Sequence, residues 1–251
     1  MFSFFGKVSY SMPQALIVKK KIITNTLVIM WLKPDEPFTF KPGQYCTVGI
    51  QGLERPYSIA SAPPPYEELI EFFLEVVPQE QRTEKSLSPK LYDLPQGETV
   101  TLRPTAKGHF LLEENYPTQV MVSTTTCITP YVSMLRAYLH GYYKTTFSKP
   151  IYVFHGASYQ TEFGYFEELK TMEKTGKVIY IPTISRPTET PNQSWKGQTG
   201  RVNNILLESF KKFNISPSES LVYLCGNKKM IEAAKATLTQ AGYKTKQEVF
   251  F

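Results

Sequence analysis

The feature that most limits the fold is a change of rhythm near residue 115. After it, short apolar stretches typical of buried strands alternate with amphipathic stretches typical of helices. The strand-like stretches are QVMVS, IYVFHGAS, KVIYIPTIS, LVYLCG and QEVFF, and helix-like stretches occupy 129–143, 163–176, 201–213 and 227–242. This alternation predicts a parallel sheet with helices on both faces. Such sheets bind ligands at the carboxyl ends of the strands, near the point where the strand order reverses.

The first part of the chain has a different pattern. One short helix is expected over 86–94, and β-rich stretches lie at 15–20, 25–32, 40–50, 55–61, 69–77, 98–104 and 109–114. Many short strands at close spacing predict an antiparallel barrel or sandwich. A chain of 251 residues suits two domains of moderate size. We therefore predict an N-terminal antiparallel β-barrel domain over 1–114, followed by a parallel-sheet α/β nucleotide-binding domain over 115–251.

The composition excludes several function classes. With 41% hydrophobic and 20% charged residues, the chain is an ordinary globular protein. A net charge of +6 suits an acidic partner or a phosphorylated ligand, and no basic block indicates nucleic acid. The run KKK at 19–21 is interpreted as a solvated strand edge. Three separated cysteines and three scattered histidines indicate neither a disulfide framework nor a metal site.

The sequence also carries an expectation about location. The stretch MFSFFGKVSY lacks the basic start of a signal peptide. No stretch approaches the ~18 apolar residues of a membrane span. We expect a cytoplasmic protein that has no membrane partner.

The stretch RPYSIAS at 55–61 carries the clearest chemistry. Arg55 can bind a diphosphate through two parallel hydrogen bonds, and Tyr57 can stack on a flat heterocycle. Ser58 can hydrogen-bond a ring nitrogen. Together these side chains describe a flavin dinucleotide lying along a strand. From spacing alone, an edge strand whose polar residues face water remains the alternative.

Several further stretches occur in an order that matches a known family: FKPGQY, RPYSIAS, SLSPKL, CITPYVSMLR, TGRV, LCGNKKM and the terminal EVFF. Residues 15–251 resemble the ferredoxin/flavodoxin–NADP⁺ reductases, especially the short bacterial type. The resemblance implies an FAD-containing oxidoreductase. Such an enzyme transfers hydride between NADP(H) and the flavin, and single electrons to or from ferredoxin or flavodoxin.

The resemblance implies roles for individual residues as well. Ser58, Cys225 and Glu248 would be catalytic, the last two flanking the docked nicotinamide. The FAD would be held by Arg55, Pro56, Tyr57, Ser58, Val76, Val77, Ser86, Leu87, Ser88, Thr126, Phe250 and Phe251. NADP(H) would be held by Ser158, Ser185, Arg186, Arg201, Gly226 and Asn227. Phe250 would cover the second flavin face and move aside for the nicotinamide, and no metal is implied.

Two positions depart from the family pattern. Thr125 stands where a glycine is expected after the first strand of the α/β half, and its Cβ would crowd an approaching pyrophosphate. Ser158 stands where many bacterial members carry a third arginine. Arg186 and Arg201 remain for the 2′-phosphate of NADP. We therefore expect a preference for NADPH over NADH that is weaker than usual.

The partners and two rival functions complete the expectations. The partners would be NADPH and an acidic ferredoxin or flavodoxin. We expect the chain itself to be a monomer. One rival is an NADH-dependent flavoprotein reductase that serves an oxygenase, or a diaphorase. The other is an FAD-binding sensor module that has lost nucleotide turnover, an idea motivated by Thr125 and Ser158.

Overall fold

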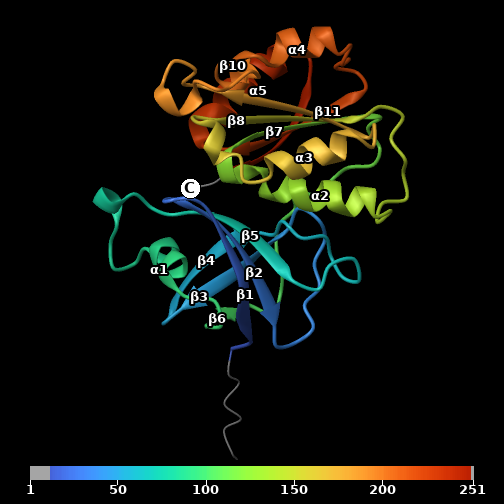
Figure 1. Ribbon diagram of the computed structural model, residues 1–251. Coiled ribbons are helices and arrows are strands. Elements are labelled where there is room, and N and C mark those ends of the chain that lie inside the picture. The colour runs from blue at the N-terminus through green and yellow to red at the C-terminus, as the bar shows by residue number, and fades with distance from the viewer. Residues whose placement is uncertain (1–11, 250–251) are drawn as a thin grey trace, which may run out of the picture.

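The computed structural model describes residues 12–249 and contains two six-stranded sheets, one above the other in Figure 1. The first sheet has the order β4-β3-β6-β1-β2-β5, and its paired strands are antiparallel. Its elements are β1 Gln14–Thr24, β2 Leu27–Pro34, β3 Tyr45–Ile50, β4 Leu53–Ser58, β5 Ile70–Glu75, α1 Leu87–Asp93 and β6 Thr99–Leu102.

The first sheet curls around an apolar interior. Side chains such as Ile17, Met30 and Phe72 form its core. The amide of Ala60, just after β4, donates to the carbonyl of Glu71 on β5 at 2.8 Å, which joins the two edges of the sheet. Among the described residues, β4 itself pairs along its length only with β3, so the barrel closes beyond the end of β4 and leaves that edge open. The antiparallel barrel predicted from the sequence is confirmed.

The second sheet has the order β10-β9-β8-β7-β11-β12, and all its strands are parallel. Helices α2 and α3 pack on one face, and α4 and α5 on the other (Figure 1). This confirms the predicted α/β half. Its elements are β7 Thr118–Thr124, α2 Thr129–Leu139, β8 Ile151–Ala157, α3 Phe166–Glu173, β9 Val178–Ile184, β10 Gln198–Thr199, α4 Leu206–Lys212, β11 Ser220–Gly226, α5 Lys228–Gln240 and β12 Lys244–Val249.

Three local expectations are wrong. Residues 109–114 form no strand, because Phe110 and Leu112 are buried in a connecting segment. The helix expected over 201–213 is divided into a 3₁₀ turn, Val202–Asn204, and the helix α4. The turn contains Asn203 and Asn204, and asparagine favours turns over helix interiors. Lys20 in the KKK run is not simply solvated, because its ammonium donates to carbonyls at the end of α1.

The short 3₁₀ turns are Gln79–Gln81, Thr125–Ile128, Gln160–Glu162, Thr190–Asn192 and Val202–Asn204.

Helix α2 connects the two halves. The Ser133 hydroxyl donates to the Ser61 carbonyl at 2.7 Å, and Arg136 Nη1 lies 2.6 Å from a Glu71 carboxylate oxygen. Both acceptors belong to the barrel. The halves therefore meet through specific polar contacts as well as apolar packing. No helix among the described residues is long and apolar enough to cross a bilayer.

Candidate functional site

The strand order of the parallel sheet reverses between β7 and β11. Thr125 and Thr126 follow β7 directly, and Cys225 and Gly226 end β11. These residues lie where parallel sheets bind their ligands. A Cβ added to Gly226 would lie 2.9 Å from the Thr124 hydroxyl oxygen, so the two strand ends approach closely. A side chain there would require one of the segments to move.

A row of polar side chains crosses the carboxyl end of this sheet. Ser123 on β7 pairs with Cys225 on β11, and Cys225 pairs with Glu248 on β12. Ser123 Oγ and Glu248 Oε2 are buried and have no hydrogen-bond partner among residues 12–249. Buried polar atoms are nearly always paired in folded proteins. Two unpaired atoms in one row fit a site that receives a polar ligand.

The protonation states in the row follow from burial. Burial raises the pKa of Glu248 to about 7, so both forms of the carboxyl are populated near neutral pH. Burial, then a hydrogen bond with Cys127, hold the pKa of the Cys225 thiol well above its usual range. Cys225 is therefore a neutral thiol and is not equipped to act as a thiolate nucleophile. Glu248 is the group in the row that can exchange a proton.

The predicted flavin residues lie on β4, at one edge of the barrel sheet. Arg55 and Pro56 are exposed, Tyr57 is half-buried and Ser58 is 5% exposed. Pro56 lacks an N–H, which suits an edge strand. The Tyr57 ring meets Phe72 edge to face, with centroids 6.2 Å apart, and burial raises its pKa to about 12. A guanidinium and a neutral aromatic ring along one edge fit a planar, anionic ligand.

Arg55 reaches from β4 to the segment before α1. Its Nη2 donates to the Lys85 carbonyl at 3.0 Å, and its Nη1 donates to the Glu54 carbonyl at 2.7 Å. The guanidinium therefore lies beside Ser86, a residue predicted to bind the pyrophosphate. Leu87, the next residue predicted there, is buried in the barrel core, so only its backbone is available to a ligand.

Two hydrogen bonds occupy the backbone predicted to meet the flavin's polar edge. The Val76 amide donates to the Thr26 carbonyl at 2.8 Å, and the Val77 amide donates to Ser88 Oγ at 3.1 Å. Neither amide is free for a ligand in this conformation. Ser88 accepts in its bond, so its own hydroxyl proton remains available to an anion.

The predicted 2′-phosphate residues are held together by a side chain that the sequence did not single out. Asn192, 2% exposed, donates to the carbonyls of Ser158 at 2.9 Å and Arg186 at 2.8 Å. Its Oδ1 accepts from the Gln160 amide at 2.8 Å. An asparagine in a polar loop is typical of turns, so nothing local in the sequence indicates this role.

Arg201 is held next to the same loop. The Gly200 amide donates to the Ile184 carbonyl at 2.8 Å, and Thr183 Oγ1 donates to the Gly200 carbonyl at 2.8 Å. Ser185 follows β9 directly, and its amide donates to the Ala157 carbonyl at 2.9 Å. Of the two exposed arginines predicted to bind phosphate, Arg186 thus follows β9 and Arg201 follows β10, the strand paired with it.

Two further residues that the sequence did not single out surround Arg186. The Tyr159 hydroxyl accepts from Arg186 Nη1 at 2.8 Å and donates to the Glu189 carboxylate. Glu189 Oε1 also lies 3.6 Å from Arg186 Nη1. A carboxylate therefore stands inside the predicted phosphate site. Asn227 caps α5 by accepting from the Met230 amide at 2.9 Å.

The three predicted catalytic residues come from both halves of the chain. Ser58 lies on the barrel, three residues before Ser61, which contacts α2, whereas Cys225 and Glu248 lie on the second sheet. Phe250 and Phe251 lie outside the described residues. The catalytic assignment of Ser58, Cys225 and Glu248 therefore stays a prediction, as does the assignment of the cofactor-binding residues.

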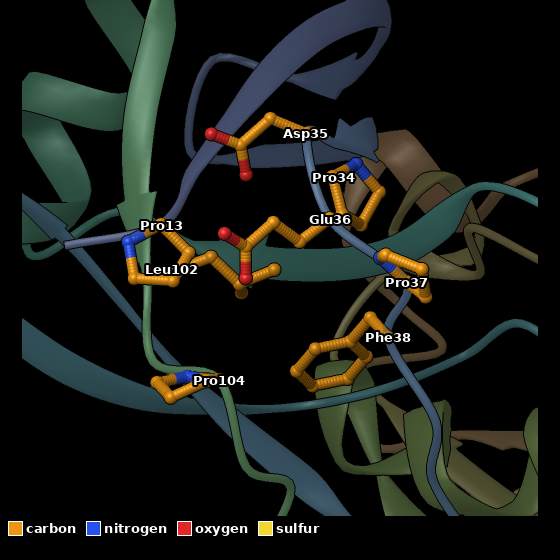
Figure 2. Close-up of a pocket in the computed structure, with 8 residues that line it drawn as sticks. All are labelled: Pro13, Pro34, Asp35, Glu36, Pro37, Phe38, Leu102 and Pro104. Carbon is orange, nitrogen blue, oxygen red and sulfur yellow. The ribbon is translucent and has the colours of Figure 1, made fainter. Parts of the chain in front are cut away.

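Two hollows on the surface are lined by residues other than the predicted site residues. Figure 2 shows the first, of about 20 Å³, lined mainly by prolines with Asp35, Glu36 and Phe38. That volume holds about one water molecule. A larger groove of about 650 Å³ runs beside β9 and is lined by Tyr180 and Trp195 among others. None of the predicted site residues lines either hollow.

Known proteins with similar sequences identify the family. The family model of the oxidoreductase NAD-binding domain matches residues 121–236, within the parallel-sheet half. The flavodoxin/ferredoxin–NADP reductase of Escherichia coli is 30% identical over 210 residues, which cover 79% of this chain and 77% of that protein. The chain belongs to the ferredoxin–NADP reductase family.

Two other relatives show how the family varies. The electron transfer component of xylene/toluene monooxygenase from Pseudomonas putida is 31% identical over 234 residues. The match covers 91% of this chain but 61% of that relative's length. The crystal structure of a ferredoxin NADP⁺ reductase from Neisseria gonorrhoeae, with bound FAD and NADP, has a TM-score of 0.78 at 21% identity. The two chains cover each other by 96% and 98%, which confirms the two-domain fold of the ferredoxin–NADP reductase family.

Proposed function

We propose that the chain is an FAD-dependent oxidoreductase that transfers hydride between NADP(H) and flavin. It would exchange single electrons with an acidic ferredoxin or flavodoxin. Residues 1–114 would bind the FAD, and residues 115–251 the nucleotide. The observation that most supports this proposal is the polar row at the strand-order reversal, where the unpaired Glu248 Oε2 lies beside Cys225 in a member of this family.

The residues on β4 fit the cofactor. Arg55 would pair with the diphosphate, and Tyr57 would cover one face of the flavin ring and exclude water from it. Ser58 would hydrogen-bond the ring edge. Bound FAD would supply the redox chemistry, because its ring accepts a hydride and can return electrons singly.

The polar row would act on the nicotinamide. Cys225, a neutral and fully buried thiol, would fill the space beside the ring without attacking it. Glu248 would orient the ring and hold or release a proton at Oε2, because its pKa of about 7 allows both states. Ser123 would satisfy its unpaired hydroxyl on the same ligand.

The nucleotide preference rests on the loop after β9. Arg186 and Arg201 support binding of a 2′-phosphate, and hence NADPH over NADH. Glu189 opposes this preference, because its carboxylate already pairs with Arg186 and repels a phosphate. An acidic residue at this place suits a ribose hydroxyl instead. Glu189 is therefore the observation that favours the second candidate, an NADH-dependent reductase of an oxygenase, the class of the Pseudomonas relative.

The net charge and the free cysteines indicate the kind of protein partner and the cellular compartment. A net charge of +6 supports steering of an acidic protein partner toward a monomeric enzyme. The three cysteines among the described residues are all free, which suits a reducing compartment such as the cytoplasm.

An anaerobic absorbance experiment tests the proposal. The purified chain is reconstituted with FAD, and its flavin bands are followed after addition of NADPH and, separately, NADH. Fast bleaching by NADPH and slow bleaching by NADH is the expected result. Equal bleaching would favour the second candidate, and bleaching by neither nucleotide would overturn the reductase proposal. Failure to retain FAD would contradict the roles given to Arg55, Tyr57 and Ser58.

A further inference from the structure

A buried histidine on β8 lies in the same row as the predicted catalytic groups. His155 pairs in register with Ser123 and is fully buried. Its Nε2 is 2.8 Å from the Thr125 carbonyl oxygen, and its Nδ1 is 3.1 Å from the Tyr180 hydroxyl oxygen. The proposed function gives His155 no part.

The two hydrogen bonds fix the tautomer of the ring. A carbonyl oxygen can only accept, so Nε2 carries the proton and donates to Thr125. Burial lowers the pKa of His155 to about 4, so the ring is neutral at pH 7 and Nδ1 accepts from Tyr180. Phe163 packs edge-on against the imidazole, with centroids 4.9 Å apart. The ring is thus held on three sides and keeps its N–H aimed at Thr125.

The backbone that receives this bond is in a rare conformation. Thr125 has φ of +43°, in the left-handed region. A β-branched residue is a genuine outlier there, whereas glycine adopts the region freely. Strained residues persist only where their surroundings over-determine them. The bond from His155 is the side-chain contact that fixes the Thr125 carbonyl.

We propose that His155 is a positioning residue that clamps Thr125 in the left-handed conformation and thereby holds Thr126 at the nucleotide and flavin site. The contacts described above support the clamp between His155 and Thr125. The binding of a nucleotide and a flavin at Thr126 rests on the proposed function. The same turn carries Cys127, which is buried in the same apolar cluster as Cys225. A displaced turn would therefore disturb the polar row as well.

A double-mutant cycle tests the clamp. His155→Leu removes both hydrogen bonds, and Thr125→Gly removes the strain that the clamp opposes. In the wild-type background we expect His155→Leu to raise the KM for the nucleotide about tenfold, with kcat reduced less than about twofold. In the Thr125→Gly background the same substitution should raise KM less than about threefold, because glycine needs no clamp. Equal effects in the two backgrounds would overturn the proposal.

Thermal unfolding provides a second readout that needs no nucleotide. The loss of Tm caused by His155→Leu should be smaller when residue 125 is glycine. If the wild-type chain bleaches with neither nucleotide, the proposed function fails, yet this coupling still decides the clamp. Asn214→Gly is the matched control, because Asn214 has φ of +52° at an exposed turn and contacts neither residue. It should leave the effect of His155→Leu unchanged.

A conservative pair of variants covers the case in which His155→Leu does not fold. His155→Gln places an amide N–H where Nε2–H stood, whereas His155→Asn is too short to reach Thr125. The clamp requires that Gln preserve the nucleotide KM within about threefold and that Asn raise it about tenfold. If Asn performs as well as Gln, His155 does not act through Thr125.

Discussion

The guanidinium of Arg136 on α2 and the carboxylate of Glu71 on β5 lie 2.6 Å apart across the junction of the two halves. Glu71 is 2% exposed, and its other oxygen accepts from the Tyr165 hydroxyl at 2.8 Å. Arg136 also pairs with Glu168 at 2.6 Å. A buried carboxylate of the barrel is thus neutralised by residues of the parallel-sheet half.

Removal of this cation should destabilise the whole chain. Arg136→Met leaves Glu71 buried without its counter-charge, which we expect to lower the free energy of unfolding by roughly 3–5 kcal/mol. Urea unfolding followed by tryptophan fluorescence measures the change. Arg103→Met is the control, because Arg103 forms a solvent-exposed pair with Glu54 at 2.6 Å, and it should lower the free energy of unfolding far less than Arg136→Met does. Equal losses of unfolding free energy in the two variants would show that the buried Arg136–Glu71 pair contributes no more to stability than an exposed pair.

The raised pKa of Glu248 makes stability depend on pH in a defined direction. Between the ordinary pKa of 4.5 and about 7, the unfolded chain releases this proton while the folded chain keeps it. The contribution of Glu248 to the free energy of unfolding is therefore most favourable below pH 4.5. It decreases as the pH rises from 4.5 to about 7, by up to about 3 kcal/mol in total. Glu248→Gln cannot titrate, so the wild type should lose more stability than this variant between pH 5 and pH 8. Parallel curves from urea unfolding at the two pH values would contradict the assignment.

Glu189 should set the ratio of NADPH to NADH use. Glu189→Gln removes the carboxylate that pairs with Arg186, and we expect the ratio of kcat/KM values to shift toward NADPH about threefold to tenfold. Steady-state kinetics with each nucleotide measures it. Glu219→Gln, which breaks an exposed pair with Lys149, is the matched control and should leave the ratio unchanged. An unchanged ratio in Glu189→Gln would show that the Glu189 carboxylate does not determine the preference between the two nucleotides.

Arg55 should contribute to flavin affinity. Arg55→Gln would remove the charged, two-pronged contact proposed between Arg55 and the diphosphate, and we expect the Kd for FAD to rise roughly tenfold to a hundredfold. Quenching of flavin fluorescence on titration with the apoprotein gives the Kd. Arg103→Gln changes a nearby exposed arginine that has no predicted ligand role. A similar loss in both variants would indicate a general charge effect.

The sequence indicates those parts of the fold that depend on short-range patterns. The alternation from β7 to β12 predicts the parallel sheet, because each strand and helix carries its own periodicity. The strand with Arg55 and Tyr57 is predicted for the same reason. The segment at 109–114 has an equally apolar pattern, yet Phe110 and Leu112 are buried by the neighbouring core rather than by strand pairing.

Other parts of the site depend on contacts between distant segments. Asn192 bridges Ser158 and Arg186, which are 34 and 6 residues away. His155 and Thr125 are 30 residues apart, and only the folded sheet brings them together. The sequence marks Thr125 as an unexpected residue. It does not show that the threonine adopts the conformation of the glycine it replaces.

The exposed edge at β4 also matters for the chain before it receives a cofactor. An uncovered strand edge invites pairing with another chain, but Pro56 has no N–H to offer there. If β4 is the FAD-binding strand, as proposed, freshly synthesised molecules would expose it before FAD binds and still resist joining edge to edge. A proline inside the predicted binding motif would thus protect the empty protein from aggregation and leave the Tyr57 ring accessible to the cofactor.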